Sequence, residues 1–223
     1  MAIVLNIETA TTNCSVSLSK DGEILVLKED NSPGYSHAET LHVFIDEVFK
    51  VSNIKPSEID AIAVSKGPGS YTGLRIGVSS AKGLSFALNK PLIAIDTLES
   101  LSHQVHIEDG FIVPMLDARR MEVYSAIYNS ELELYREIKA EILEEGSFSK
   151  LLETSKVYFI GSGVEKTKGL IQHSNAVFIE GKLPSANEMA LLAELKHQKS
   201  DTEDVAYFEP YYLKDFIALK KKA

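Results

Sequence analysis

The chain has 223 residues, of which 44% are hydrophobic and 25% charged, and this balance excludes a disordered chain and indicates a globular protein with a sizeable core. The formal net charge of −9 opposes broad neutralisation of nucleic-acid phosphates by the chain alone. A single cysteine, Cys14, excludes an internal disulfide framework and fits a reducing cytoplasm.

The hydropathy pattern gives no sign of export or membrane insertion. Residues 1–10 lack the basic start of a signal peptide, and no apolar run approaches the roughly 18 residues of a membrane span. We therefore expect a cytoplasmic protein without membrane association. Lys214 and the lysines at 220–222 are interpreted as part of a solvated end of the chain.

The first elements in chain order predict an antiparallel meander. Residues 3–7 form an apolar run, and residues 14–19 alternate between polar and apolar side chains. Residues 23–28 can pair back as a third strand because Asp21-Gly22 favours a tight turn.

Helices and strands then alternate. A capping-box pattern formed by Ser36 and Glu39 predicts a helix over residues 37–51. The next predicted elements are a strand at 61–65, a glycine-rich loop, a helix at 72–89, a strand at 91–95, and a helix that starts at Asp96 and continues to Val105.

The second part of the chain repeats this order. Residues 111–120 read as an apolar strand that reaches a carboxylate at Asp117, as the first strand reaches one at Glu8. Further strands are predicted at 122–129, 131–138 and 157–163, and a helix capped by Ser185 and Glu188 carries Met189, Leu192 and Leu195.

This repeat predicts a duplicated α/β protein of the actin/hexokinase/Hsp70-like (ASKHA) architecture. Its two related halves, residues 1–108 and 109–223, each have a mixed sheet and helices. No linker of Pro, Gly and Ser separates them, so we expect the halves to pack against each other. The C-terminal tail is free to pack back on the first half.

The glycine-rich loop at residues 66–77 reads KGPGSYTGLRIG and does not fit the common nucleotide-binding loops. No Gly-Lys-Ser/Thr follows at phosphate-loop spacing, and Gly67 and Gly69 are followed by Gly73 rather than by a glycine at 72, as the dinucleotide fingerprint requires. Two interpretations remain open. The start of the helix attracts an anion through its free N–H groups, or the loop is an ordinary strand-to-helix turn.

The helix after this loop has a face of small residues. Gly73, Gly77 and Ala81 are four residues apart, so they lie on one side of the helix and remove side-chain bulk there. Because each glycine costs a helix interior roughly 1 kcal/mol, we expect a close contact to offset that cost. The contact is either another helix or the interior of the chain itself. Arg75 lies in the first turn, which predicts a carboxylate or phosphate partner for it.

Five residues are candidates for contact with a nucleotide or another anion: Glu8, Thr11, Gly69, Ser70 and Asp117. Kinases of this architecture place an acidic residue and hydroxyls at the first hairpin, around magnesium and phosphate. The two halves bring Glu8 and Asp117 to equivalent hairpins, so both would face one cleft.

The hairpin turns themselves oppose self-sufficient ATP chemistry. Glycine beside the acidic residue would let a phosphate approach the backbone, but Thr9-Ala10 and Ala118-Arg119 stand there instead. A small-molecule kinase or ATPase therefore remains an alternative function and not the preferred one.

Neither a metal site nor a catalytic residue is predicted. His37 and His42 are five residues apart and share a helical face poorly, and His103 and His106 have no acidic ligand between them. Ser70 lacks an identifiable base and a nucleophile-elbow motif.

Four segments together resemble one family. These are residues 3–18, the GPGSYTGLRIG loop, DARRMEVY at 117–124 and EPYYLKD at 209–215, and they are similar to the TsaB (YeaZ) family of the glycoprotease-like (Gcp/Kae-like) superfamily. The resemblance implies a non-catalytic scaffold or activator in the synthesis of tRNA N6-threonylcarbamoyladenosine. It implies pairing with the related catalytic subunit TsaD and with the ATPase TsaE, a homodimer when alone, and contact with tRNA only through the complex.

Catalytic TsaD-like proteins differ from this chain at one informative place. They carry a His-X-X-X-His metal pair after the strand that matches residues 91–95, whereas this chain reads DTLES at 96–100. The resemblance therefore implies no cofactor on the chain alone, with nucleotide at the complex interface. A glycoprotease-like metallopeptidase is the second alternative.

Family pairing runs through the first-half helices, here the predicted helices at 37–51 and 72–89. The partner-interface residues that follow from this and from the small-residue face are Gly73, Leu74, Arg75, Gly77, Val78, Ala81, Leu41, Ile45 and Val48.

Overall fold

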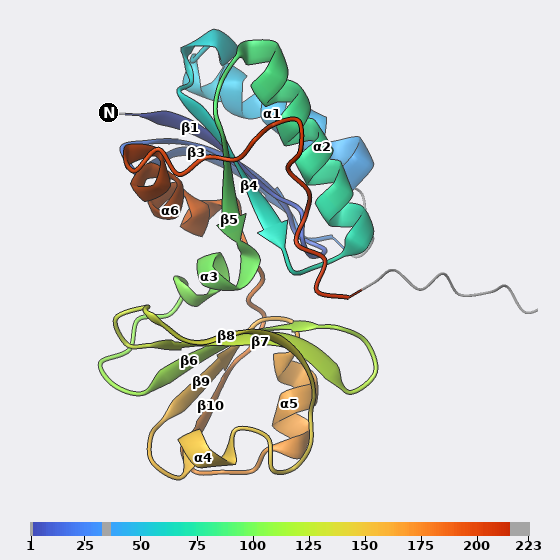
Figure 1. Ribbon diagram of the computed structural model, residues 1–223, viewed down its shortest axis with the longest axis vertical. Coiled ribbons are helices and arrows are strands. Elements are labelled where there is room, and N and C mark those ends of the chain that lie inside the picture. Colours follow the sequence, from blue (N-terminus) through green and yellow to red (C-terminus); the bar gives the residue numbers. More distant parts are fainter. Residues whose placement is uncertain (1, 33–36, 215–223) are drawn as a thin grey trace, which may run out of the picture.

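Two five-stranded sheets, one in each half, form the frame of the molecule in a computed structural model that describes residues 2–32 and 37–214 (Figure 1). The first sheet has the order β3-β2-β1-β4-β5. Its strands are β1 (Ile3–Glu8), β2 (Cys14–Lys20), β3 (Glu23–Asp30), β4 (Ala61–Gly67) and β5 (Leu92–Asp96). The second sheet consists of β6 (Phe111–Asp117), β7 (Glu122–Asn129), β8 (Leu134–Ile142), β9 (Val157–Ile160) and β10 (Ala176–Ile179).

The two sheets share one topology. In the first, β1, β2 and β3 pair antiparallel, and β4 and β5 extend the sheet in parallel. In the second, β6, β7 and β8 repeat the meander, and β9 and β10 repeat the parallel extension. The duplicated α/β fold predicted from the sequence is therefore confirmed.

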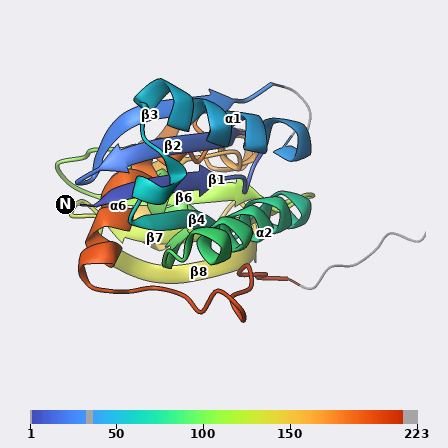
Figure 2. The ribbon, with the colours of Figure 1, turned by 90° about the horizontal axis from the view of Figure 1, so that it is seen from above.

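Helices cover both sheets, and two of these helices pack on the half of the molecule to which they do not belong in sequence. The helices are α1 (His37–Ser52), α2 (Tyr71–Leu88), α3 (Thr97–Ser102), α4 (Ser149–Leu152), α5 (Val164–Leu170) and α6 (Ala186–Gln198), with a short 3-10 turn at Pro56–Glu58. α1 and α2 cover one face of the first sheet, and α6 lies on its opposite face (Figures 1 and 2). α3 packs mainly against β6 and β7 of the second sheet, and it also contacts β4 and β5 of the first.

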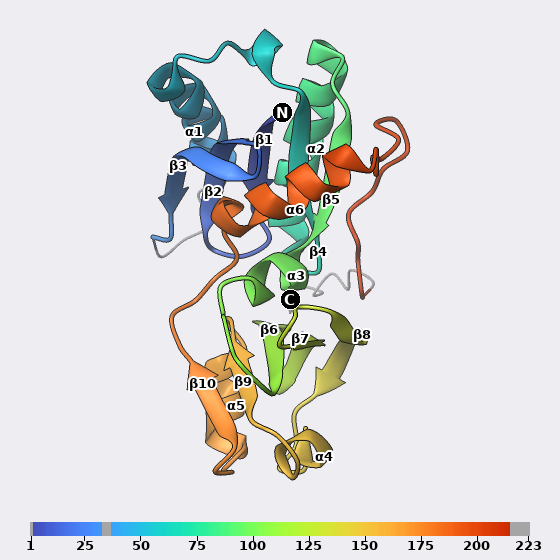
Figure 3. The ribbon, with the colours of Figure 1, turned by 90° about the vertical axis from the view of Figure 1, so that its left-hand side faces the viewer.

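Each half therefore receives its third layer from the other part of the chain. Ala186, Met189 and Ala193 of α6 are buried against the first sheet, although α6 follows β10 in sequence (Figure 3). The boundary near residue 108 describes the path of the chain, but it does not separate two independent cores.

Residues 203–214, which we call the C-terminal strap, also return to the first half. The strap leaves the end of α6, crosses the edge of the first sheet and runs down beside α2 (Figure 1). The Glu203 amide donates to the Leu92 carbonyl at 2.8 Å, and Val205 and Phe208 pack against the core beneath α1 and α2.

Several predicted element bounds differ from the structure. The third helix ends at Ser102 rather than at Val105, and the third strand of the second half begins at Leu134 because Asn129 and Leu132 form a turn. Asp96 does not cap α3 with its side chain, because its carboxylate pairs with Lys66 at 3.0 Å. Ser36 lies outside the described residues. Among those described, no helix combines the length and apolar character needed to cross a membrane.

Candidate functional site

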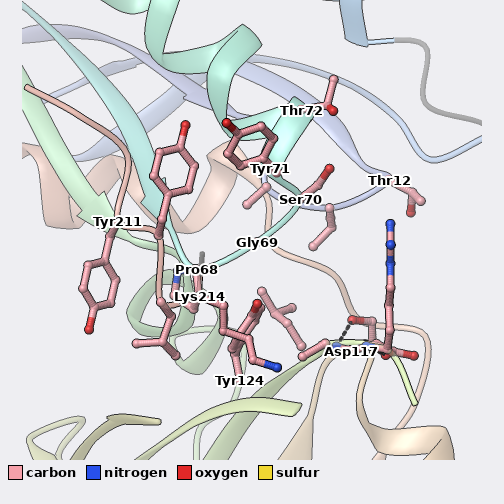
Figure 4. Close-up of a pocket in the computed structure, with 18 of the residues that line it drawn as sticks. Thr12, Pro68, Gly69, Ser70, Tyr71, Thr72, Asp117, Tyr124, Tyr211 and Lys214 are labelled. Atoms are coloured by element: carbon pink, nitrogen blue, oxygen red, sulfur yellow. Dashed lines mark hydrogen bonds between the residues drawn. The ribbon is translucent and has the colours of Figure 1, made fainter. Parts of the chain in front are cut away.

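A cavity of about 570 Å³ lies between the two halves (Figure 4). Its walls come from the turn after β1, the loop between β4 and α2, the turn after β6, and the end of the C-terminal strap. The residues that line it include Thr11, Gly69, Ser70, Tyr71, Asp117, Arg119, Tyr124, Ser162, Tyr211, Tyr212 and Lys214.

The structure brings four of the five predicted anion-contact residues to this cavity. Thr11, Gly69 and Ser70 line it from the first half, and Asp117 lines it from the second. Glu8 does not line it, because its side chain is fully buried beneath the turn. The prediction of an anion contact at Glu8 is therefore wrong for this structure.

Glu8 is an unusual buried acid. Its Oε1 accepts hydrogen bonds from the Ala10 amide at 2.5 Å and the Ser65 hydroxyl at 2.9 Å, while its Oε2 has no hydrogen-bond partner among the described residues. Burial raises the pKa of this carboxyl to about 7, because the surrounding core disfavours its charged form.

The glycine-rich loop packs tightly against the turn after β1. The Ser70 amide donates to the Ala10 carbonyl at 2.7 Å, and a Cβ atom at Gly69 would lie only 2.5 Å from that same oxygen. The Ser70 hydroxyl in turn accepts from the Gly73 amide and caps α2. Both of these N–H groups are bonded within the chain, so neither is free to bind a phosphate, and the anion contact at this loop stays a prediction.

The predicted small-residue face of α2 is covered by the same chain. A Cβ atom would lie 2.1 Å from the Thr9 carbonyl at Gly73 and 2.2 Å from the Thr9 hydroxyl at Gly77. That hydroxyl donates to the Gly73 carbonyl at 2.8 Å. The glycines therefore provide clearance for the turn after β1, and their interpretation as an open face for a partner helix is wrong.

Most of the other predicted interface residues are also buried within the chain. The buried ones are Leu74, Val78 and Ala81 on α2, and Leu41, Ile45 and Val48 on α1. Arg75 is the one exposed member of the predicted set. Its guanidinium lies 4.1 Å from the Tyr71 ring centroid, and its Nε donates to the Tyr212 hydroxyl at 3.3 Å. Its partners among the described residues are aromatic, and no carboxylate is among them; the phosphate alternative stays a prediction.

A second stripe of small residues on α2 faces outward. It comprises Thr72, Ser79, Gly83 and Ala87, all exposed, and we call it the outer face of α2. A Cβ atom at Gly83 would meet no atom of residues 2–32 and 37–214 within 4 Å, so no contact in this part of the chain explains this glycine. Phe86, 84% exposed, stands beside the stripe, and Val43 on the neighbouring α1 is 50% exposed.

In the second half, one lysine fixes the turn after β6. The Lys166 ammonium donates to the Asp117 carboxylate at 2.7 Å and to the carbonyls of Arg120 and Glu122 at 2.7 and 3.0 Å. Arg119 and Arg120 have backbone φ angles of +70° and +52°, which residues other than glycine rarely adopt. Lys166 therefore neutralises Asp117 and holds a strained turn at the cavity wall.

No arrangement of the described residues indicates a metal centre. Within residues 2–32 and 37–214, no group of three or more His, Cys, Asp and Glu side chains could hold a metal ion. The segment at 96–100 begins α3, where Thr97 and Ser100 are buried.

Sequence reasoning missed three residues that shape this region: Lys82, Lys166 and Tyr212. Each acts across a long stretch of chain, as when Lys82 donates to the carbonyl of Phe208. The EPYYLKD motif marked the tyrosines, but nothing in the sequence placed them at the cavity.

Comparisons with known proteins agree with the fold and with the sequence motifs. The family model for TsaD, tRNA N6-adenosine threonylcarbamoyltransferase, matches residues 34–222. The tRNA threonylcarbamoyladenosine biosynthesis protein TsaB of Escherichia coli (strain K12) is 30% identical over 230 residues, covering 98% of this chain and 97% of that protein. TsaB of Bacillus subtilis (strain 168) is 28% identical, covering 95% and 93%.

The transferases themselves match less of the chain. The tRNA N6-adenosine threonylcarbamoyltransferase of Staphylococcus haemolyticus is 33% identical over 129 residues, which cover 51% of this chain and 38% of that protein. Among solved structures, YeaZ from Pseudomonas aeruginosa superposes with a TM-score of 0.82 at 26% identity, covering 96% of this chain and all of that one. Because the TsaB and YeaZ matches cover nearly the full length of this chain and of each matched protein, the chain belongs to the TsaB (YeaZ) family.

Proposed function

We propose that the chain is a non-catalytic scaffold and activator in the synthesis of tRNA N6-threonylcarbamoyladenosine, and that it pairs with the transferase TsaD through the outer face of α2 and the adjoining part of α1. The single observation that carries the interface is Gly83, an exposed helix-interior glycine with nothing near its absent side chain. Such a glycine costs a helix roughly 1 kcal/mol, and close approach of a second helix offsets that cost.

The surroundings of Gly83 suit a helix partner. Ser79 and Ala87 extend the surface of small side chains by one helical turn on each side of Gly83. The exposed ring of Phe86 supplies apolar area beside it. The Ser80 hydroxyl lies 3.4 Å from His42 Nε2, so α1 adjoins α2 and its Val43 widens the surface. Two copies of the chain would pair through this same surface when TsaD is absent.

The cavity supports a non-catalytic role. Asp117 is already paired with Lys166, and the amides of Ser70 and Gly73 are bonded within the chain. Asp96 and Glu99 stand in the region where the catalytic relatives carry their histidine pair, and Asp96 is bonded to Lys66. These features favour a scaffold over a kinase, an ATPase or a metallopeptidase.

The proposal assigns no cofactor to the chain alone. Nucleotide binds at the interface of the complex, which the ATPase TsaE joins, and tRNA is reached through the complex in the cytoplasm.

The substitution Gly83→Leu tests the proposed interface. Leucine favours helix more than glycine does, so the variant is expected to fold with equal or greater stability. Its side chain blocks close helix approach, and overpacking of about 1–3 kcal/mol corresponds to a loss of affinity for TsaD of about 5-fold to 150-fold. Calorimetry or size-exclusion mass measurement of the mixture provides the readout.

The matched control is Gly169→Leu. Gly169 is also a helix glycine with no atom near its absent side chain, but it lies in α5 of the second half. This control is expected to bind TsaD like the wild type. Undiminished binding and complex activity of Gly83→Leu would remove the outer face of α2 as the interface.

A further inference from the structure

The C-terminal strap is attached to the flank of α2 by side chains that border the proposed interface. The Lys82 ammonium donates to the carbonyls of Ala206 and Phe208 at 3.2 and 2.8 Å. About two turns earlier along α2, Arg75 donates to the hydroxyl of Tyr212. The rings of Tyr71 and Tyr212 also lie 5.0 Å apart, centroid to centroid.

Beyond these attachments, the same segment enters the cavity between the halves. Tyr211 and Lys214 stand at the cavity in Figure 4, opposite Asp117 and Tyr124 of the second half. Lys214 forms an ion pair with Glu122 and so reaches across to the second half.

The glycine-rich loop is shaped to receive the strap. The Tyr211 amide donates to the Lys66 carbonyl at 2.7 Å. Gly67 has a φ of +115°, and a Cβ atom there would lie 2.8 Å from the Tyr211 carbonyl oxygen. Only glycine permits this backbone and this approach, so loop and strap form one wall of the cavity.

The two ends of the strap are held with different strength. Val205 and Phe208 are packed against the core, whereas residues 211–214 are held by hydrogen bonds, ring contacts and an exposed ion pair. Contacts of that kind are individually weak in water. Residues 211–214 can therefore separate from the wall while residues 203–208 stay in place.

We infer that the C-terminal strap couples the flank of α2 to the cavity between the halves. A macromolecule that takes Arg75 or Lys82 away from the strap loosens the cavity wall, and a ligand that takes Tyr212 or Lys214 into the cavity loosens the strap on α2. By thermodynamic linkage, the macromolecule then changes the affinity for the cavity ligand by the same factor by which that ligand changes the affinity for the macromolecule. The identity of the macromolecule on α2 as TsaD rests on the proposed function, but the coupling within the chain does not.

The first arm of the test uses the full chain alone. Amide hydrogen exchange by NMR is compared among the wild type, the double variant Arg75→Ala/Lys82→Ala, and Lys150→Ala as a surface-lysine control in the distant α4. We expect the Tyr211 amide, which donates to the Lys66 carbonyl, to exchange at least tenfold faster in the double variant and at the wild-type rate in the control. Unchanged exchange in the double variant would overturn the coupling.

A second variant protects this arm against a folding defect. Gly67→Ala changes no side chain of α2, but it strains the loop and places a Cβ atom against the Tyr211 carbonyl, so it should release the strap from the opposite side. We expect the same faster exchange at residues 211–214, with the core amides of β1 and β4 still protected. Retained protection at residues 211–214 counts against the inference.

The second arm adds TsaD to the wild-type chain. Binding that changes exchange at residues 211–214 supports the coupling. Binding with no change there overturns its role toward TsaD and leaves the proposed function standing. Absence of binding removes the proposed function, while the first arm still decides the coupling.

Discussion

Glu8 occupies a fully buried position in which one carboxylate oxygen has two donors and the other has none among the described residues. Because burial raises its pKa from 4.5 to about 7, the folded state holds a proton more tightly than the unfolded state does. The stabilisation from this proton is complete below about pH 4.5 and is lost as the pH rises through about 7. At 1.36 kcal/mol per pKa unit, the loss is about 3 kcal/mol.

We therefore predict that Glu8→Gln removes this pH dependence. The free energy of unfolding of the wild type should fall between pH 5 and pH 8 by about 2–3 kcal/mol more than that of the variant. Urea unfolding at the two pH values measures the difference. Parallel losses in the two proteins would show that Glu8 titrates normally in the folded chain.

At the scale of elements, α2 has two stripes of small residues with opposite roles. The inner stripe, Gly73 and Gly77, admits Thr9, whereas a Cβ atom at Gly83 on the outer stripe would meet no described residue within 4 Å. The same residue type therefore serves intrachain packing on one side and, in our proposal, partner binding on the other.

This difference predicts opposite effects of two alanine substitutions. Gly77→Ala places a Cβ atom against the Thr9 hydroxyl and should destabilise the chain by about 1–3 kcal/mol. Gly83→Ala meets no neighbour and should stabilise it by about 0.5–1 kcal/mol. Urea or thermal unfolding of both variants decides the assignment, and a stable Gly77→Ala would show that the turn after β1 yields easily.

At the scale of the whole molecule, each half depends on a helix from the other part of the chain. Without α6, the first sheet would expose the buried side chains of Val4, Ile93 and Ile95. A fragment of residues 1–108 lacks the C-terminal strap as well as α6, so two of the segments that cover the core of the first half are missing.

We predict that this fragment does not fold cooperatively. Its apolar face should produce aggregation and the absence of a sigmoidal urea transition, because buried apolar area is the main source of stability. Circular dichroism during urea titration measures this, with the full chain as the control. A cooperative transition in the fragment would mean that residues 1–108 form an independent domain.

The predictable parts of the molecule were those that depend on local pattern. Alternation and helical periodicity located the strands around residues 3–28 and the helices at 37–51 and 72–89, and the repeat of this order predicted the duplicated fold. The short helices α4 and α5 and the strand β10 were missed because they span too few residues to show a clear period.

The parts that failed depend on distant neighbours. The sequence shows that Gly73 and Gly77 are small, but it cannot show that Thr9 fills the space beside them. It shows that Asp96 suits a helix cap, but not that Lys66 takes its carboxylate. The C-terminal strap has no periodicity at all, so its place beside the cavity could come only from the fold.

The exchanged position of α6 also sets an order of events during synthesis. The first sheet is complete at β5, yet its cover arrives only after residues 97–185 have been made, which takes about 4–18 s at ribosomal rates of ~5–20 residues per second. The α1 and α2 side can pack at once, while the opposite apolar face waits uncovered. Newly made chains therefore present α1 and α2, which face a partner in our proposal, before the cavity exists, and they need protection from aggregation on the other face during that interval.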